Sequence, residues 1–214
     1  MVKLEKYHYI VVEGPIGVGK TSLAQRISDH LDSRLLLEEP KANPFLDKFY
    51  SDISRYALPT QLFFLFQRNE QVESLVNIDM FSQVVVSDFL LDKDQLFAKL
   101  TLNDAEYNLY QNIYSHLQPS RLIPDLVIYL QASPSTLINR VKQRDNVFER
   151  KISEDYLWRL SEAYTRFFYQ YEGAPVMIVN SGNLNFVESQ SDFDLLLRRL
   201  EQMRGPREYF NLGQ

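Results

Sequence analysis

The sequence Gly14-Pro15-Ile16-Gly17-Val18-Gly19-Lys20-Thr21 decides the fold and the first binding site of this 214-residue chain. Its pattern, G-x-x-x-x-G-K-T, follows the apolar run Tyr9–Val12 and precedes apolar residues at helical spacing. The sequence therefore predicts a loop between a strand and a helix. Because glycine has no Cβ, this backbone can turn tightly and point successive N–H groups at phosphate oxygens. The octapeptide predicts binding of a nucleoside triphosphate.

Two side chains of this loop carry chemistry of their own. Lys20 is placed to reach the β- and γ-phosphates, and the Thr21 hydroxyl is a magnesium ligand by type and position. The N-terminus of the following helix adds its positive end to the same anion site. We expect ATP and Mg²⁺ to bind along the whole of residues 14–21.

Composition narrows the class of protein. The chain is 45% hydrophobic, which supplies one substantial core, and its length predicts a single domain over residues 1–214. A net charge of -5 argues against a nucleic acid as partner. The chain has no cysteine and few histidines, so neither a disulfide framework nor a zinc site is expected. No apolar segment resembles a targeting or membrane-spanning sequence, and we predict a cytoplasmic protein with no membrane partner.

Apolar runs separated by helical stretches indicate a doubly wound α/β fold with a five-stranded parallel sheet. Ligands of such sheets bind beyond the carboxyl ends of the strands, so the polar residues that follow each strand are the functional candidates. The expected strands are Tyr9–Val12, Arg34–Leu37, Val84–Val86, Leu126–Leu130 and Val176–Val179.

Acidic residues follow two of these strands. Glu38-Glu39-Pro40 ends the second strand, and Ser87-Asp88 ends the third. We expect the Glu39 carboxylate to face the phosphate loop, orient an acceptor hydroxyl and accept its proton. Asp88 is expected near the magnesium ion. The alternative for the first pair is two solvated acids before a turn.

A long helix is predicted over Pro59–Val76 from its apolar stripe. Gln61 and Arg68 lie seven residues apart and therefore on one face of it. A glutamine amide presents a donor beside an acceptor, as reading the edge of a base requires. The alternative is a pair of exposed polar side chains.

A basic cluster follows the fourth strand. Arg140 and Arg144 share a helix face, and a polar run through Lys151 precedes a helix that Ser153 is expected to cap. Guanidinium groups stabilise the charge that spreads over a transferring phosphoryl group. We predict an arginine-rich lid at about residues 144–152, and we expect Arg140 and Arg144 to act in catalysis.

The order of several short motifs resembles the deoxynucleoside kinase family over Tyr9 to about Leu200. These are Glu39-Pro40 shortly before Asn43, then Tyr50, Gln61, the pair Asp88 and Asp94 six residues apart, and Leu96-Phe97-Ala98. The resemblance implies the P-loop nucleoside-kinase fold and transfer of a phosphoryl group from ATP to the 5′-hydroxyl of a deoxynucleoside. Family members are commonly dimers, so a homodimer is expected.

The resemblance also implies roles for single residues. Glu39 matches the general base, Gln61 and Asp94 match the residues that bind the base, and Arg68 matches an arginine that anchors an acidic partner. Two further positions match residues that contact the sugar 3′-hydroxyl, Tyr50 and Glu149.

One position departs from the family pattern. The triplet Asp88-Phe89-Leu90 stands where the family has an acid, an arginine and a serine, and that arginine holds the catalytic acid and the phosphates. Either another arginine (Arg55, Arg140 or Arg144) substitutes, or the activity or its acceptor has changed.

The sequence therefore favours a deoxynucleoside kinase for a purine, with deoxyadenosine first, because Gln61 and Asp94 suit an amino group beside a ring nitrogen. Two alternatives stay open. One is a nucleoside monophosphate kinase of the thymidylate type, which needs a basic pocket for the phosphate of its acceptor. The other is a nucleotide-binding regulatory protein without turnover, which the missing arginine would fit.

Overall fold

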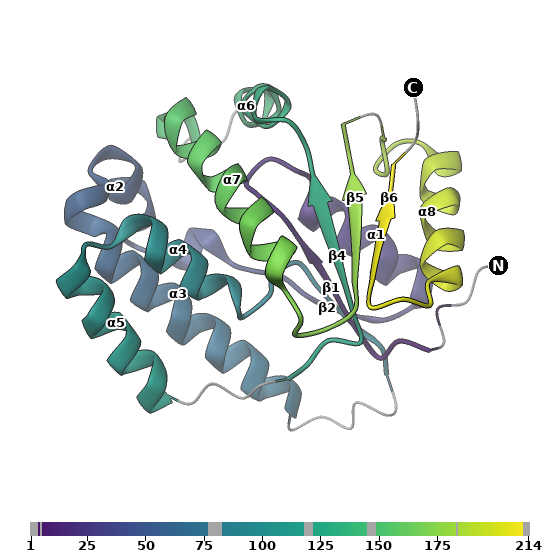
Figure 1. Ribbon diagram of the computed structural model, residues 1–214, viewed down its shortest axis with the longest axis horizontal. Coiled ribbons are helices and arrows are strands. Elements are labelled where there is room, and N and C mark those ends of the chain that lie inside the picture. The colour runs from purple at the N-terminus through teal and green to yellow at the C-terminus, as the bar shows by residue number, and fades with distance from the viewer. Residues whose placement is uncertain are drawn as a thin grey trace.

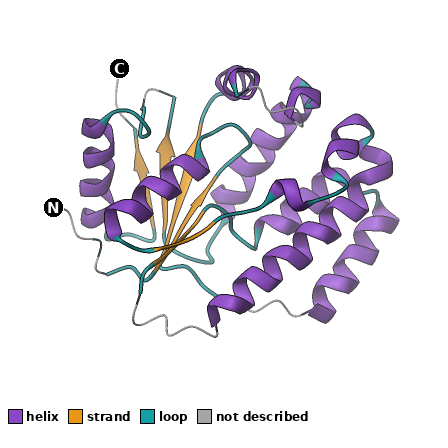
Figure 2. Ribbon diagram, turned by 180° about the vertical axis from the view of Figure 1, so that it is seen from behind, coloured by secondary structure: helices purple, strands orange, loops and turns teal. Residues whose placement is uncertain are grey.

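The computed structural model describes residues 4, 6–76, 83–117, 122–144, 149–182 and 184–211, which form three layers with a parallel sheet between helices (Figures 1 and 2). The strands are β1 (Tyr9–Glu13), β2 (Arg34–Leu36), β3 (Val85–Ser87), β4 (Leu126–Gln131), β5 (Val176–Asn180) and β6 (Arg207–Phe210). The helices are α1 (Lys20–Leu31), α2 (Leu46–Ser51), α3 (Ile53–Val76), α4 (Lys93–Thr101), α5 (Asp104–Leu117), α6 (Pro134–Gln143), α7 (Glu154–Gln170) and α8 (Gln190–Gln202), with 3-10 turns η1 (Pro40–Ala42) and η2 (Glu149–Lys151).

The sheet has the order β2-β3-β1-β4-β5-β6, and neighbouring strands are parallel. The predicted parallel α/β sheet is confirmed, but its expected strand number of five is one short. The added strand, β6, pairs with β5 at the edge of the sheet. Of its residues only Phe210 is buried, so the apolar alternation that marks a strand is too faint to detect in the sequence.

Side chains of β1 alternate between two cores, as the pleat of a strand requires. Ile10 and Val12 pack toward α1 and α8, whereas Tyr9 and Val11 pack toward α3 and α7. Figure 2 shows α1 crossing the face of the sheet opposite to α7. Because both faces are covered, the central strands are continuous apolar runs.

Helix α3 begins earlier than predicted, at Ile53 instead of Pro59, and contains the proline within it. The Asp52 carboxylate accepts a hydrogen bond from the Arg55 N–H (3.2 Å), which is a capping contact that precedes the proline by two turns. The predicted cap of α7 at Ser153 is confirmed, and α6 begins in the same way at Ser133. Ser133 and Ser153 each accept a hydrogen bond from the backbone N–H three residues on.

Parallel pairing places the carboxyl ends of the strands along one edge of the sheet, the upper edge in Figure 1. The phosphate loop joins β1 to α1 at this edge, and the acids after β2 and β3 lie beside it. Within the part of the chain that the structure describes, no helix combines the length and apolarity needed to cross a bilayer.

Candidate active site

The phosphate loop has the backbone geometry that its glycines allow. Gly14 and Gly17 have φ values of 152° and 84°, and a Cβ on Gly14 would lie 2.5 Å from the backbone oxygen of Leu130. The Lys20 ammonium donates to the carbonyl oxygens of Gly14 (2.8 Å) and Pro15 (3.3 Å), which closes the loop on itself. Burial lowers the pKa of Lys20. A bound phosphate would add negative charge beside this ammonium, in addition to the carboxylates of Glu13, Glu38 and Asp88.

Thr21, Asp88 and Glu38 meet at the start of α1. The Thr21 hydroxyl donates to Asp88 Oδ2 at 2.5 Å, and the backbone N–H of Glu38 donates to Asp88 Oδ1 at 2.8 Å. A hydroxyl and a carboxylate are hard oxygen ligands that suit Mg²⁺, which needs few protein ligands because it retains water. The residues therefore fit a magnesium ion held by Thr21 and Asp88. Among the described residues, no cluster of three or more His, Asp or Glu side chains offers an all-protein metal cage.

A cavity of about 510 Å³ opens from the phosphate loop toward α3 and α4. It brings together side chains that are far apart in the sequence, as a binding site for a small molecule requires. Of the predicted site residues, those that line it are Ile16, Gly17, Lys20, Thr21, Tyr50, Gln61, Arg68, Asp88, Arg144 and Glu149.

The structure corrects the expectation that Glu39 faces the phosphate loop. Glu39 is exposed and lies outside the residues that line the cavity, whereas Glu38 lines it. Glu38 is held there by its N–H bond to Asp88 and by its carboxylate contacts with Arg68. The 3-10 turn η1 starts at Pro40 and leads the chain away from the cavity immediately after Glu39.

Two cations surround the Glu38 carboxylate. Arg68 Nε donates to Glu38 Oε1 at 2.7 Å, and Lys93 Nζ lies 3.3 Å from the same oxygen. Burial alone would raise the pKa of Glu38, but the charges of Arg68 and Lys93 outweigh burial and lower it to about 2. Glu38 is consequently ionised at neutral pH and accepts hydrogen bonds.

The far end of the cavity has groups that suit a base. Gln61 is buried, and its amide lies at the edge of hydrogen-bond distance from the Thr101 hydroxyl (3.5 Å). Arg68 also forms an ion pair with Asp94, which is 1% exposed. Asp94 Oδ1 faces Arg68 in this ion pair, Oδ2 is buried without a hydrogen-bond partner among the described residues, and Asp94 does not line the cavity. Arg68, which does line the cavity, therefore connects Asp94 to this end of it.

The same cavity is lined by the two residues that the family resemblance assigns to the sugar 3′-hydroxyl. Burial raises the pKa of Tyr50 well above its ordinary value, so its hydroxyl remains a donor. Glu149, in η2, lines the same cavity, and its buried Oε2 accepts no hydrogen bond. A donor and an acceptor thus face the space between the base end and the phosphate loop. The lid residues 145–148 lie outside the described part of the chain.

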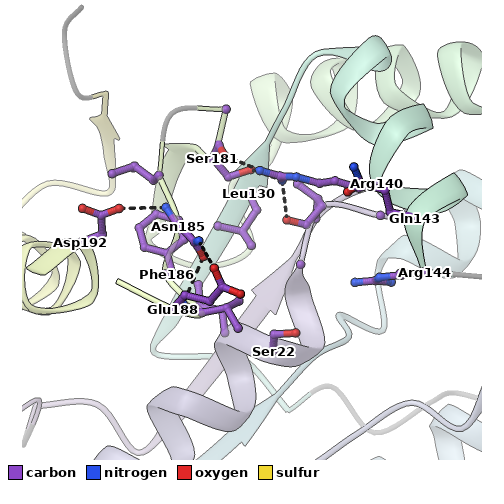
Figure 3. Close-up of a pocket in the computed structure, with 17 residues that line it drawn as sticks. Ser22, Leu130, Arg140, Gln143, Arg144, Ser181, Asn185, Phe186, Glu188 and Asp192 are labelled. Carbon is purple, nitrogen blue, oxygen red and sulfur yellow. Dashed lines mark hydrogen bonds between the residues drawn. The ribbon is translucent and has the colours of Figure 1, made fainter. Parts of the chain in front are cut away.

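A second cavity, of about 690 Å³, lies on the other side of the phosphate loop (Figure 3). Arg140 from α6 donates to the backbone oxygens of Val18 (3.2 Å) and Ser181 (2.9 Å), joining the loop to the segment after β5. Asn185 and Phe186 form the opposite wall. Arg144 lines both cavities, which places it where a donor and an acceptor would meet. The described residues of the segment 181–186, which follows β5, line this space.

Some residues are placed differently from the sequence expectation, and others were not predicted. Arg55 is exposed and packs over the Tyr56 ring, outside both cavities. Phe89 is fully buried in the core on the α7 side. Sequence reasoning missed Lys93 and Glu13, which lie buried beside Glu38 and the loop. A lysine next to Asp94 gives no sequence signal of burial, because lysine is almost always exposed.

Comparisons with known proteins agree with this geometry. The model of the deoxynucleoside kinase family matches residues 10–203. The deoxyguanosine kinase of Bacillus subtilis is 33% identical over 91% of this chain and 97% of its own length. The deoxyadenosine kinase of Lactobacillus acidophilus is 28% identical over 90% of this chain and 94% of its own length. A solved structure of deoxyadenosine kinase from M. mycoides with the products dCMP and dCDP superposes with a TM-score of 0.80 at 26% identity, over 91% of this chain and all of that one.

Proposed function

The chain belongs to the deoxynucleoside kinase family, and we propose that it transfers the γ-phosphoryl group of ATP to the 5′-hydroxyl of a purine deoxynucleoside. One observation carries the proposal. A single cavity joins Lys20 and Thr21 of the phosphate loop to the Glu38 carboxylate and to the base-reading groups of α3. A phosphate donor and an uncharged acceptor can meet in it.

The placement of the arginines favours a nucleoside over a nucleoside monophosphate as acceptor. Arg68 is committed to Glu38 and Asp94, and Arg55 lies outside the cavity. A thymidylate-type kinase would need such cations for the phosphate of its acceptor. Arg144 lies beside the phosphate loop, where it would contact the transferred group instead.

Glu38 takes the role of the acceptor-activating group in this proposal. As an ionised carboxylate it accepts a hydrogen bond from the 5′-hydroxyl and orients the oxygen toward the γ-phosphorus. A carboxylate with a pKa near 2 is a weak base, but phosphoryl transfer passes through a loose transition state that demands little deprotonation of the nucleophile early on. Glu38 then receives the hydroxyl proton as the new P–O bond forms.

The loop, Lys20 and the lid arginines hold the donor. Backbone N–H groups of residues 14–21 and the Lys20 ammonium would bind the phosphates, and Arg140 and Arg144 would stabilise the charge that develops on the transferred group. Thr21 and Asp88 would hold magnesium, which neutralises phosphate charge during transfer.

The buried groups at the far end of the cavity support a purine, with deoxyadenosine first. The Gln61 amide can donate to a ring nitrogen and accept from an exocyclic amino group, and Asp94 Oδ2, the carboxylate oxygen not paired with Arg68, can accept a further N–H. Thymine has no amino group to offer. Tyr50 and Glu149 would bind the sugar 3′-hydroxyl.

A phosphorylation assay with labelled ATP and Mg²⁺ tests this proposal. The acceptors are deoxyadenosine, deoxyguanosine, deoxycytidine, thymidine and thymidine monophosphate. We expect turnover of the purines, a loss of roughly 10²-fold or more in kcat for Glu38→Gln, and a kcat within about twofold of wild type for the neighbouring Glu39→Gln. Phosphorylation of the monophosphate alone, or of no acceptor, would refute the proposed function. Loss of activity in Glu39→Gln but not in Glu38→Gln would return the role of base to Glu39.

A further inference from the structure

Lys93, the first residue of α4, is a buried lysine in the acceptor cavity. It is 2% exposed, and its ammonium lies 3.3 Å from Glu38 Oε1 and 3.4 Å from Glu13 Oε2. Removing an ammonium group from water is costly unless anions compensate for the lost hydration. The two carboxylates provide this compensation, so the charge of Lys93 is fixed at a defined place between β1 and the end of β2.

Glu13 anchors Lys93 rather than serving the reaction itself. Its carboxylate accepts hydrogen bonds from the N–H groups of Gly14 and Leu90 (both 2.8 Å) and from the Tyr164 hydroxyl (3.1 Å). It is fully buried and does not line the acceptor cavity. Glu38 lines that cavity together with Lys93. The ammonium is thus held on the protein side by Glu13 and presented to Glu38 on the cavity side.

Arg68, the other cation beside Glu38, binds a second carboxylate as well. Arg68 contacts both Glu38 and Asp94, and Asp94 is a base-reading group of the proposed site. In the proposed site, Arg68 therefore connects Glu38 to the base end of the cavity. Within the described part of the chain, Lys93 forms its ion pairs with Glu38 and with Glu13 of β1, and neither of these is at the base end. It can hold Glu38 in one place whatever base occupies the cavity.

No arginine takes the place of Lys93 as the cation beside Glu38 from position 89 or from the predicted substitutes. The side chain there is Phe89, which packs in the apolar core, and the arginines that the sequence suggested as substitutes lie elsewhere. Arg55 is outside both cavities, and Arg140 is bonded to the donor-side backbone. Arg144 lines the cavity but comes from the end of α6, next to the lid.

We propose that Lys93 is the positioning residue for the Glu38 carboxylate and supplies, from the start of α4, the fixed positive charge that an arginine at position 89 would otherwise bring to the phosphoryl-transfer site. The inference rests on the proposed function, because Glu38 is its acceptor-orienting group. It adds a residue to the reaction that neither the phosphate-loop motif nor the lid contains.

The test replaces Lys93 with methionine, which keeps the length of the side chain and removes its charge. We expect kcat to fall by roughly 10²-fold. We expect the KM for the deoxynucleoside, and its Kd measured by calorimetry without ATP, to change by less than about threefold, since Lys93 does not contact the base end. Lys99→Met, an exposed lysine of the same helix, is the matched control and should behave as wild type.

Chemical rescue separates the charge from the packing. The chain contains no cysteine, so Lys93→Cys introduces a single thiol. Treating the denatured variant with 2-bromoethylamine and refolding it rebuilds a lysine-like ammonium at this position alone, and wild type taken through the same steps is the control. We expect the aminoethylated variant to recover at least a tenth of the wild-type kcat, and the unmodified thiol variant to stay at the level of Lys93→Met.

A folding defect can be told apart from the proposed role. If Lys93→Met does not fold, the double variant Glu13→Gln/Lys93→Met removes the unpaired buried acid together with the lysine. A folded double variant with the full loss of kcat supports the proposal, and one with wild-type kcat overturns it. A folded Lys93→Met enzyme with wild-type kcat also overturns it. The wild-type assay tests the proposed function separately. A wild-type protein that phosphorylates no deoxynucleoside refutes that function before any variant is compared.

Discussion

The ion network around Glu38 predicts how the stability of the protein depends on pH. The pKa of Glu38 is about 2 in the folded protein, against an ordinary value of 4.5. A carboxyl group whose pKa is lowered by folding stabilises the folded state at pH values above its unfolded pKa. This stabilisation is lost as the pH falls through the window from about 4.5 to 2. At roughly 1.4 kcal/mol per pH unit, the difference corresponds to about 3 kcal/mol at neutral pH.

Urea unfolding of wild type and Glu38→Gln between pH 6 and pH 3, without nucleotide or magnesium, measures this term. The variant lacks the titrating group, so the gap between the two unfolding free energies should shrink by about 2 kcal/mol as the pH falls from 6 to 3. Other acids titrate equally in both proteins and cancel. Glu39→Gln, at the exposed neighbouring position, should run parallel to wild type. Parallel curves for Glu38→Gln and wild type would refute the assignment of Glu38 to a charged, buried network.

Further predictions concern the loop and its support. Gly14→Ala would place a Cβ 2.5 Å from a backbone oxygen of β4, so the melting temperature of this variant should drop by several degrees. The control Gly205→Ala, where the nearest atom to the new Cβ is 3.6 Å away, should melt as wild type does. Equal melting temperatures for the two variants would contradict the close approach at Gly14. Tyr164→Phe removes a hydrogen bond to the buried Glu13 carboxylate and should lower the free energy of unfolding in urea by about 1–3 kcal/mol. The control Tyr169→Phe, at a position that is 72% exposed, should leave it unchanged. An unchanged unfolding free energy for Tyr164→Phe would show that Glu13 does not need this donor.

Local sequence rules predicted the parts of the fold that depend on nearby residues. The phosphate loop follows from the backbone freedom of glycine at fixed spacing, and the caps at Ser133 and Ser153 follow from contacts three residues apart. The buried strands appear as apolar runs because both of their faces are covered. The β6 strand escaped prediction because its edge position leaves most of its side chains partly exposed.

The identity of the cavity carboxylate could not be predicted from the sequence. Glu38 and Glu39 are adjacent acids after the same strand, and a shift of one residue exchanges which one faces inward. The choice is made by Asp88 and Arg68, which lie 50 and 30 residues away in the chain. Lys93 likewise finds its partners only through the fold. Magnesium, the homodimer, the cytoplasmic location and the preferred base remain predictions.

The core between the sheet and helices α1 and α8 is built from both ends of the chain. Leu4 and Tyr7 pack into it beside residues of α8 and β6, and the Tyr7 hydroxyl donates to the Leu200 carbonyl (3.1 Å). A ribosome-bound chain that has not yet exposed residues 190–210 therefore presents an uncovered apolar face of the central strands to water. Transiently exposed faces of this kind favour aggregation and chaperone binding. For this protein, completing this core must wait until residues 190–210 have been synthesised, and until then its early strands lack the helix that will cover them.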